Sequence, residues 1–297
     1  MRARVALTPL LATLLLFASA ALPRIALATP SLDGCTGVLH LHEPASEGVV
    51  VDTPGVWCLD QDLVTDVDAV DGVIVMITVA AEDVTIDCRG HRIEFLGNAD
   101  VSRGVSTFDY RHRTVIRNCD VRGFSNAIAA GGADYLIEDN LVQASRPSLY
   151  GDGTAIQGYG TGTIRNNRIH DAISLGIGAT DSAQVTGNLI DGVSGTSDWS
   201  EAIGIEVQSA DAAEIRGNTI RGLSSGEASQ IFGVIVDSQG GSAPSHVIDN
   251  VLVHDGSIGP IGIFCPGQAH LIDNVIDGFY APLVSGCVDA GDNDISP

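Results

Sequence analysis

Short apolar runs separated by polar residues fill most of this chain, and one arrangement of them recurs. In the segment GIGATDSAQVTGNLIDG, an aliphatic residue, Val185, is followed after two residues by Asn188 and after one more by Ile190. The same spacing returns at Ile137/Asn140/Val142, Ile164/Asn167/Ile169, Ile215/Asn218/Ile220, Val247/Asn250/Leu252 and Leu271/Asn274/Ile276. Six copies of one spacing indicate a repeat architecture.

Two imperfect copies extend the series, Ile116/Cys119/Val121 with Cys in the Asn position and Ala290/Asn293/Ile295 as a degraded last copy. Successive Asn positions are 19 to 32 residues apart. Upstream of each copy lies a small residue followed by an aliphatic one, as in Gly176-Ile177. The apolar runs are β-branched, short, and bounded by Gly, Asn and Asp, which is typical of strands and too short for helices. Each turn therefore holds several short strands.

We predict an all-β solenoid with three strands per turn, which stacks equivalent residues about 4.8 Å apart. Asn then lies over Asn, and a buried amide has the donors and acceptors to satisfy its neighbours in such a ladder. We assign a structural role to these Asn residues. The irregular segment 29–78, with Pro44, Pro54 and Trp57, is predicted to be an N-terminal cap that covers the open strand edges, and 79–297 to be the coil.

The first 28 residues have a basic start, an apolar run and small-x-small endings, which predict a signal peptide (1–28) that is cleaved after Ala28. No later segment has the roughly eighteen apolar residues that a spanning helix needs. We therefore expect a secreted or periplasmic monomer that does not insert into a membrane.

Charge narrows the choice of partner. The 15 basic residues are all Arg, and three lie in the predicted signal peptide, which leaves 12 against 37 acidic residues and a net charge near −25. This excess of acid argues against nucleic acid as a partner. It also disfavours a polyanionic substrate unless a cation such as Ca²⁺ bridges it. Seven of the Arg residues lie within 89–122, where we expect them to pair with acids on neighbouring turns.

Six Cys residues in an exported chain predict disulfides. Cys88 and Cys119 each follow an aligned Ile in adjacent turns, so they should meet. The other predicted pairs are Cys265–Cys287, about one turn apart, and Cys35–Cys58, which bracket the cap.

The connections that follow the Asn motif differ in length. Some are short, and others swell at 143–154, 191–202 and 221–232. Because insertions confined to one corner of a solenoid usually build its binding face, we expect the site beside these loops.

The segments IDCRGHRI, VIRNCDVRGF and VTGNLIDGV resemble the carbohydrate-binding and sugar-hydrolase repeats of the right-handed parallel β-helix, or pectin-lyase-like, superfamily. The resemblance covers about residues 73–296 and implies a right-handed coil whose substrate groove lies over the strand after the long corner loops. The paired-Asp and Gly-His-Gly motifs of polygalacturonases and the Asp-Pro-His-Asp motif of mannuronan epimerases are missing. The absence of Lys excludes a Lys base, and no Arg occupies the outward positions that we considered.

Alternation along the groove strand points the residue after each aliphatic outward. The predicted substrate-binding residues are Gln157, Tyr159 and Gln208 on these strands, with Tyr150 and Trp199 in the neighbouring loops. Trp199 suits a sugar ring because an aromatic side chain in an exposed polar loop has little core to join.

The candidate catalytic pair is Glu206 and Asp237, one turn and two residues apart, which is roughly 8 Å and falls within the range of inverting glycosidases. Glu206 would act as the acid and Asp237 as the base. His170, in an outward column with Asp191, is a further acid–base candidate, although a charge-balanced surface ladder explains the same pattern. Alternatively the acids, with Asp198 and Glu201 as metal ligands, would hold Ca²⁺.

Three functions remain open from sequence alone. The leading hypothesis is a secreted β-helix protein that binds a polysaccharide and, in its enzymatic form, cleaves it as a lyase or glycoside hydrolase. The alternative is a non-catalytic structural or adhesive surface solenoid. A periplasmic metal-handling protein is a third, against which the scattered His and scarce Met residues argue.

Overall fold

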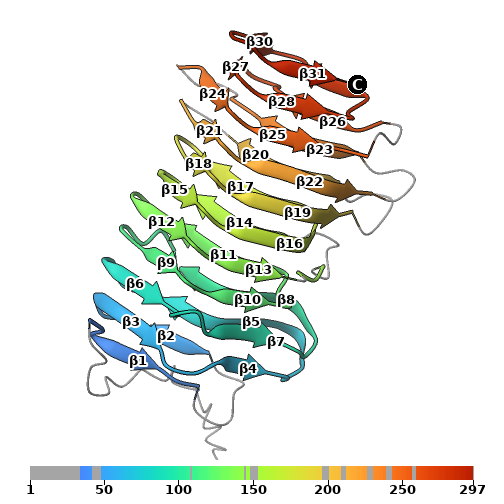
Figure 1. Cartoon of the computed structure of the whole chain (residues 1–297). Coiled ribbons are helices and arrows are strands. Elements are labelled where there is room, and N and C mark those ends of the chain that lie inside the picture. Colours follow the sequence, from blue (N-terminus) through green and yellow to red (C-terminus); the bar gives the residue numbers. More distant parts are fainter. Residues whose placement is uncertain are drawn as a thin grey trace, which may run out of the picture.

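The computed structural model describes residues 34–41, 48–107, 109–143, 145–147, 153–195, 201–208, 212–225, 230–238, 243–255 and 259–296. Within these ranges the chain is an all-β solenoid whose coils stack in chain order, from the N-terminal coil at one end to the C-terminal coil at the other (Figure 1). Every strand pairing is parallel, and the strands form three long sheets, as the sequence predicted. We call these sheets A, B and C.

Sheet B holds the aliphatic residue that precedes each Asn. Its strands, in spatial order, are β1 (Gly37–Leu39), β3 (Gly55–Leu59), β6 (Val84–Asp87), β9 (Val115–Arg117), β12 (Tyr135–Glu138), β15 (Gly162–Arg165), β18 (Gln184–Thr186), β21 (Glu214–Arg216), β24 (Ser245–Ile248), β27 (Ala269–Ile272) and β30 (Cys287–Asp289).

Sheet C follows the Asn. Its strands are β4 (Leu63–Thr65), β7 (Arg92–Phe95), β10 (Asp120–Arg122), β13 (Leu141–Gln143), β16 (Arg168–Ile173), β19 (Leu189–Ser194), β22 (Thr219–Ser224), β25 (Val251–Val253), β28 (Val275–Asp277) and β31 (Asp294–Ser296).

Sheet A carries the small-aliphatic motif. Its strands are β2 (Val49–Val51), β5 (Ala69–Val79), β8 (Ala99–Thr107), β11 (Asn126–Gly131), β14 (Thr154–Tyr159), β17 (Leu175–Thr180), β20 (Ala202–Gln208), β23 (Ile231–Val236), β26 (Ile261–Phe264) and β29 (Ala281–Val284). The connections that swell in the sequence all run from sheet C to sheet A, so they share one corner of the coil.

The interior is a set of aliphatic columns. Ile137, Ile164 and Val185 pair in register across β12, β15 and β18, and each is fully buried. Burial of such a side chain contributes about 1.5–3 kcal/mol, so the repeated column supplies much of the driving force for coiling.

The corner between sheets B and C is a turn of one left-handed residue followed by the ladder Asn. The residues in this conformation include Asp139, Asn166 and Gly187, with φ of 55°, 55° and 64°. Asn, Asp and Gly are the residues that adopt positive φ at least cost, which explains why the sequence places them directly before the Asn.

The Asn ladder is confirmed. Asn140 Nδ2 donates to Asn167 Oδ1 at 3.0 Å and to the carbonyl of Ile116 in the preceding coil, also at 3.0 Å. The pattern repeats through Asn188, Asn218, Asn250, Asn274 and Asn293. Asn140 Oδ1 accepts from the backbone N–H of Cys119, where the ladder begins.

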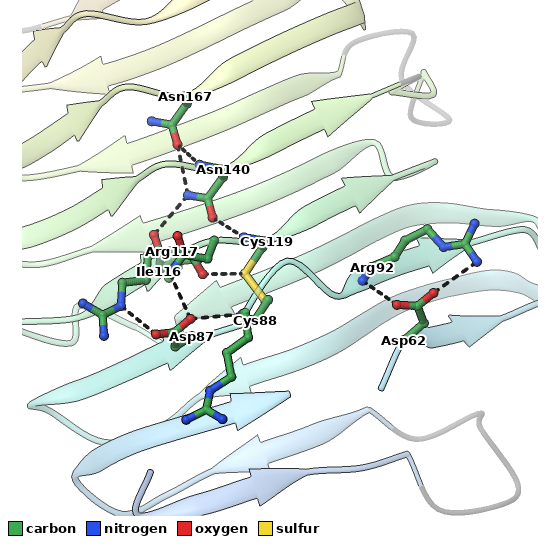
Figure 2. The surroundings of a disulfide bond; sticks show 11 residues. Asp62, Asp87, Cys88, Arg92, Ile116, Arg117, Cys119, Asn140 and Asn167 are labelled. Atoms are coloured by element: carbon green, nitrogen blue, oxygen red, sulfur yellow. Dashed lines mark hydrogen bonds and ion pairs between the residues drawn. A yellow bond between two sulfur atoms is a disulfide. The ribbon is translucent and has the colours of Figure 1, made fainter. Parts of the chain in front are cut away.

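All three predicted disulfides are present: Cys35–Cys58, Cys88–Cys119 and Cys265–Cys287. Cys119 occupies the ladder position of its coil, so Cys88–Cys119 continues the line of Asn140 and Asn167 toward the N-terminal coils (Figure 2).

The segment assigned to a cap takes part in the coil. Strands β1 to β5 lie within residues 37–79 and already belong to the three sheets, so coiling begins earlier than the Asn spacing indicated. The first coils escaped the sequence pattern because they lack the Asn. Trp57 is buried in β3, with its ring against Gly37 of β1, where any side chain would collide with it. The division into 1–28, 29–78 and 79–297 remains a prediction.

Candidate functional site

The outer face of sheet A contains a cavity of about 250 Å³ at β8, β11 and β14. Side chains that line it include Arg103, Asp109, Tyr110, Asn126, Gln157 and Tyr159. Gln157 and Tyr159 are residues that the sequence analysis proposed for substrate binding, and the structure brings them into one cavity.

Arg103 and Asn126 were missed because they precede the aliphatic residue by two positions. Strict alternation would place the small residue on one face of the strand and the following aliphatic residue on the other, yet Gly104 and Val105 are both buried. A Cβ on Gly104 would lie 2.6 Å from the Val121 side chain of sheet C, so this position points into the coil. The position two before the aliphatic therefore faces outward as well.

Next to the cavity, two buried hydroxyls tie neighbouring coils together. Ser102 and Ser125, both 2% exposed, each accept the other's backbone N–H at the Oγ atom, at 2.9 Å in both directions. Ser125 Oγ also donates to the Ser102 carbonyl. These bonds fix β8 against β11 beside Arg103 and Asn126, so the polar groups of the cavity stand on a rigid base.

Two exposed tyrosines flank the cavity on either side of Gly131. Tyr110 is 66% exposed and Tyr159 is 45% exposed. A Cβ on Gly131 would lie 3.4 Å from the Tyr110 ring and 3.6 Å from Tyr159 Cβ, which is ordinary contact. Gly131, which is buried, thus lies between the two tyrosines, and a side chain larger than that of Ala would have to displace one of them.

Arg103 is the cation of this cavity. Its guanidinium makes no hydrogen bond or ion pair with any side chain in the described part of the chain. Several other Arg residues pair with acids on neighbouring turns, as Arg113 does with Asp83 and Arg117 with Asp87 at 3.0 Å. Arg103 and Asp109 thus give the cavity one side chain of each charge.

On the C-terminal side of the cavity, the outer face of sheet A leads to Glu206. The Gln157 side chain lies across Gly178, where a Cβ would come within 2.2 Å of Gln157 Oε1. Gly178 pairs in register with Glu206 of β20, and Gln208 Nε2 donates to Glu206 Oε1 at 2.9 Å. The outward row thus runs from Gln157 over Gly178 to Glu206.

Beyond Glu206 the outer face of sheet A becomes apolar. Ile203, Phe232 and Ile235 form a buried cluster separate from the main core, and Phe264 stacks against Phe232 with ring centroids 5.7 Å apart. Ile235 pairs directly with Glu206. The outer face of sheet A is therefore polar at Gln157 and Glu206 and apolar at β23 and β26.

The acids on this face are coupled. The pKa of Glu201, whose surface is largely exposed, is raised above its ordinary value by partial desolvation and then by the negative charge of Glu206. Asp237 directly follows β23, is half-buried, and donates its backbone N–H to the Val207 carbonyl. Neither Glu206 nor Asp237 lines the cavity that holds Gln157 and Tyr159.

A larger hollow, of about 810 Å³, lies over sheet C and contains His170. His170 Nδ1 is 3.9 Å from Asp191 Oδ2, whereas Arg221 Nη2 holds the same oxygen at 2.8 Å. The hydrogen bond from Arg221 holds the pKa of Asp191 below its usual range. Asp191 therefore pairs more closely with Arg221 than with His170, which matches the charge-balanced surface ladder that the sequence analysis gave as the alternative. We favour the smaller cavity as the site because no Phe, Tyr or Trp is among the described residues that line the hollow.

Three predicted site residues, Tyr150, Asp198 and Trp199, lie outside the described residues. In the described part of the chain, no group of three or more His, Cys, Asp or Glu side chains is arranged to hold a metal ion. Because Asp198 is not among these residues, the Ca²⁺ hypothesis with Asp198 and Glu201 stays a prediction. Across the same ranges, no helix has the length and apolar character to cross a membrane.

Three comparisons with known proteins bear on the family of this chain. A solved structure, the A-module of the mannuronan C-5 epimerase AlgE6 from Azotobacter vinelandii, aligns over 84% of each chain at 12% identity with a TM-score of 0.40. A likeness this distant carries no argument about function. Among curated proteins no sequence matches significantly. Residues 103–276, more than half of the chain, match the family described as right handed beta helix region. The chain therefore belongs to the right-handed β-helix family, and the predicted hand of the coil is confirmed.

Proposed function

We propose that this protein binds a polysaccharide along the outer face of sheet A, with one sugar unit in the cavity between Tyr110 and Tyr159. The observation that carries the proposal is the pair of exposed tyrosines around a side-chain-free floor at Gly131. An aromatic ring offers an apolar face to the C–H groups of a sugar, and its hydroxyl stays in water. Asn126 and Gln157 add amide donors and acceptors that suit sugar hydroxyls.

The size of the cavity favours one unit of a longer chain. Its volume of about 250 Å³ is below the roughly 300–1,000 Å³ that encloses a drug-sized ligand. The row of polar side chains continues from Gln157, which covers Gly178, to Glu206 of the next strand. A glycan that starts in the cavity would meet these polar side chains along this row.

Charge selects among glycans. The whole chain carries a formal charge of −22, which repels a densely anionic polymer. Arg103 offers one local cation, balanced by Asp109. These features favour a neutral or sparsely charged glycan. The predicted signal peptide and the three disulfides support a location outside the cytoplasm, secreted or periplasmic, where such polymers occur.

Cleavage is a second candidate, with Glu206 and Asp237 as the catalytic acids. Its support is the row that leads from the cavity to Glu206, together with the close approach of Glu201, whose pKa is raised by burial and by the charge of Glu206. Glu206→Gln would abolish cleavage and leave binding intact. If the length of the glycan stays constant during incubation with the wild-type protein, the protein binds the glycan without cleaving it.

A glycan array with matched variants tests the binding proposal. Tyr110→Ala and Tyr159→Ala should each weaken binding at least about tenfold, whereas Tyr280→Ala, which removes a tyrosine that is 74% exposed beyond β28, should not. Gly131→Val should block the cavity, and Gly131→Ala should be tolerated because its Cβ makes only ordinary contacts. Equal loss with Tyr280→Ala, or full binding by Gly131→Val, would refute the proposed site.

A further inference from the structure

His246 and His270 form a pair of neighbouring surface histidines that has no part in the proposed glycan binding. The chain has 8 His, 24 positions separate these two, and nothing in their spacing resembles a metal-binding motif. One turn of the coil lies between them, so β24 and β27 place them side by side in register on the outside of sheet B. Both residues are half-buried.

Their rings are in contact. The ring centroids are 5.5 Å apart, with an angle of 77° between the ring planes. Two imidazoles in contact at this separation can each turn one nitrogen toward a shared ion beside them, at the usual distance of about 2.0–2.1 Å. The torsion that turns an imidazole about its bond to Cβ is soft, so the edge-to-face rings can rotate into this arrangement.

We propose that His246 and His270 form a surface site for a divalent transition-metal ion, with water completing the coordination shell. Imidazole nitrogen suits Cu²⁺, Ni²⁺ and Zn²⁺, whereas Ca²⁺ and Mg²⁺ require oxygen ligands. The site is independent of the glycan cavity, which lies on sheet A, and of the Ca²⁺ hypothesis.

The surroundings permit a cation and set the number of protein ligands at two. Glu214 is the next residue in the same column, but its carboxylate is held by Arg216 at 2.7 Å, and the described residues contain no three-ligand cluster. Arg216, whose charge would oppose a metal ion, is neutralised by Glu214 and by Asp249 at 3.2 Å. On the other side of His270 lies Val288, which is neutral. The net negative charge of the chain adds a general attraction for cations.

Titration of the untagged, EDTA-stripped protein with NiCl₂ tests the site. We expect one Ni²⁺ per chain, with binding weakened at least about tenfold by His246→Gln and by His270→Gln. His91→Gln, at a histidine near Asp62 on the far end of the coil, is the matched control and should bind as the wild type does. Electron paramagnetic resonance of the Cu²⁺ complex should show coupling to imidazole nitrogen that is lost in the double variant.

A variant that keeps the ring separates metal binding from packing. His270→Phe preserves an aromatic contact with His246 and removes the nitrogens, so it should retain the wild-type melting temperature without metal and lose Ni²⁺ binding. The proposal is overturned if wild-type protein binds no Ni²⁺ in the micromolar range, if binding survives in the His246→Gln/His270→Gln double variant, or if His270→Phe binds normally. In those cases the two rings only pack against each other.

Discussion

The Asn ladder offers a perturbation whose cost follows from its hydrogen bonds. Asn188→Ala removes an oxygen that accepts from the backbone N–H and the Nδ2 of Asn167, at 2.9 and 3.0 Å. It also removes the amide that donates to the Ile164 carbonyl and to Asn218 Oδ1, at 3.0 and 2.9 Å. Asn188 is 1% exposed and Asn167 is fully buried, so water has little access to replace these bonds.

The expected loss is several kilocalories per mole. A buried donor left unpaired costs about 1–3 kcal/mol. The substitution leaves the backbone N–H of Asn167 without its acceptor, and Asn167 Nδ2 keeps only the Ile137 carbonyl. With a small cavity added, we expect unfolding to become easier by roughly 2–5 kcal/mol, which lowers the melting temperature by roughly 5–15 °C for a domain of this size.

Asn293→Ala is the matched control at the open end of the ladder. Asn293 accepts the same two bonds from Asn274, but it is half-buried, so water can take its place. We expect this variant to lose less than about 1.5 kcal/mol. Thermal and urea melts followed by far-UV circular dichroism compare the two. A loss in Asn188→Ala no larger than that in Asn293→Ala would refute the reasoning that ladder bonds matter because they are buried.

Three further predictions concern stability. Tyr135→Phe should raise the melting temperature slightly or leave it unchanged, because the buried Tyr135 hydroxyl has no hydrogen-bond partner in the described residues; a fall of several degrees in a thermal melt would contradict this. Replacing Cys88 and Cys119 by Ala opens a loop with a sequence separation of 31, which should lower the free energy of unfolding by about 3–4 kcal/mol. Hydrogen exchange should show the N-terminal coils loosening first, and uniform loosening of all coils would contradict this prediction. Asp87 is partly buried, which raises its pKa, but hydrogen bonds from Asn118 and neighbouring donors outweigh burial and hold the pKa below its usual 3.8. The stability that Asp87 contributes is therefore present above about pH 4 and is lost as the pH falls through the lowered pKa. Asp87→Asn should flatten the dependence of the melting temperature on pH between about pH 5 and pH 3, and an unchanged pH profile would exclude this role.

Much of the fold was predictable because successive coils of a solenoid repeat the same pattern of residues. The spacing of Val185, Asn188 and Ile190 fixes a strand, a corner and another strand, and each copy repeats the same physical constraints. The disulfides followed because one turn brings equivalent positions together. The first coils were harder to predict, since Trp57 and its neighbours fill the interior without an Asn to mark the corner.

The site was predicted only in part. Gln157 and Tyr159 followed from alternation, but Arg103 and Asn126 did not, because the small residue and the aliphatic that follow each of them are both buried, which strict alternation does not allow. Tyr110 lies in a turn after β8 that carries no copy of the repeat. In the apolar patch, alternation placed Ile235 and Phe264 on the outer face, and the structure adds Ile203 and Phe232 to them.

The central claim is that a sugar binds at the cavity of sheet A, and a crystal structure of the protein with the best oligosaccharide from the array tests it most directly. We predict a sugar ring between Tyr110 and Tyr159, within hydrogen-bonding distance of Asn126 or Gln157, with the chain continuing over Gly178. Density for the sugar over the sheet C hollow beside His170, with the tyrosine cavity empty, would contradict the account.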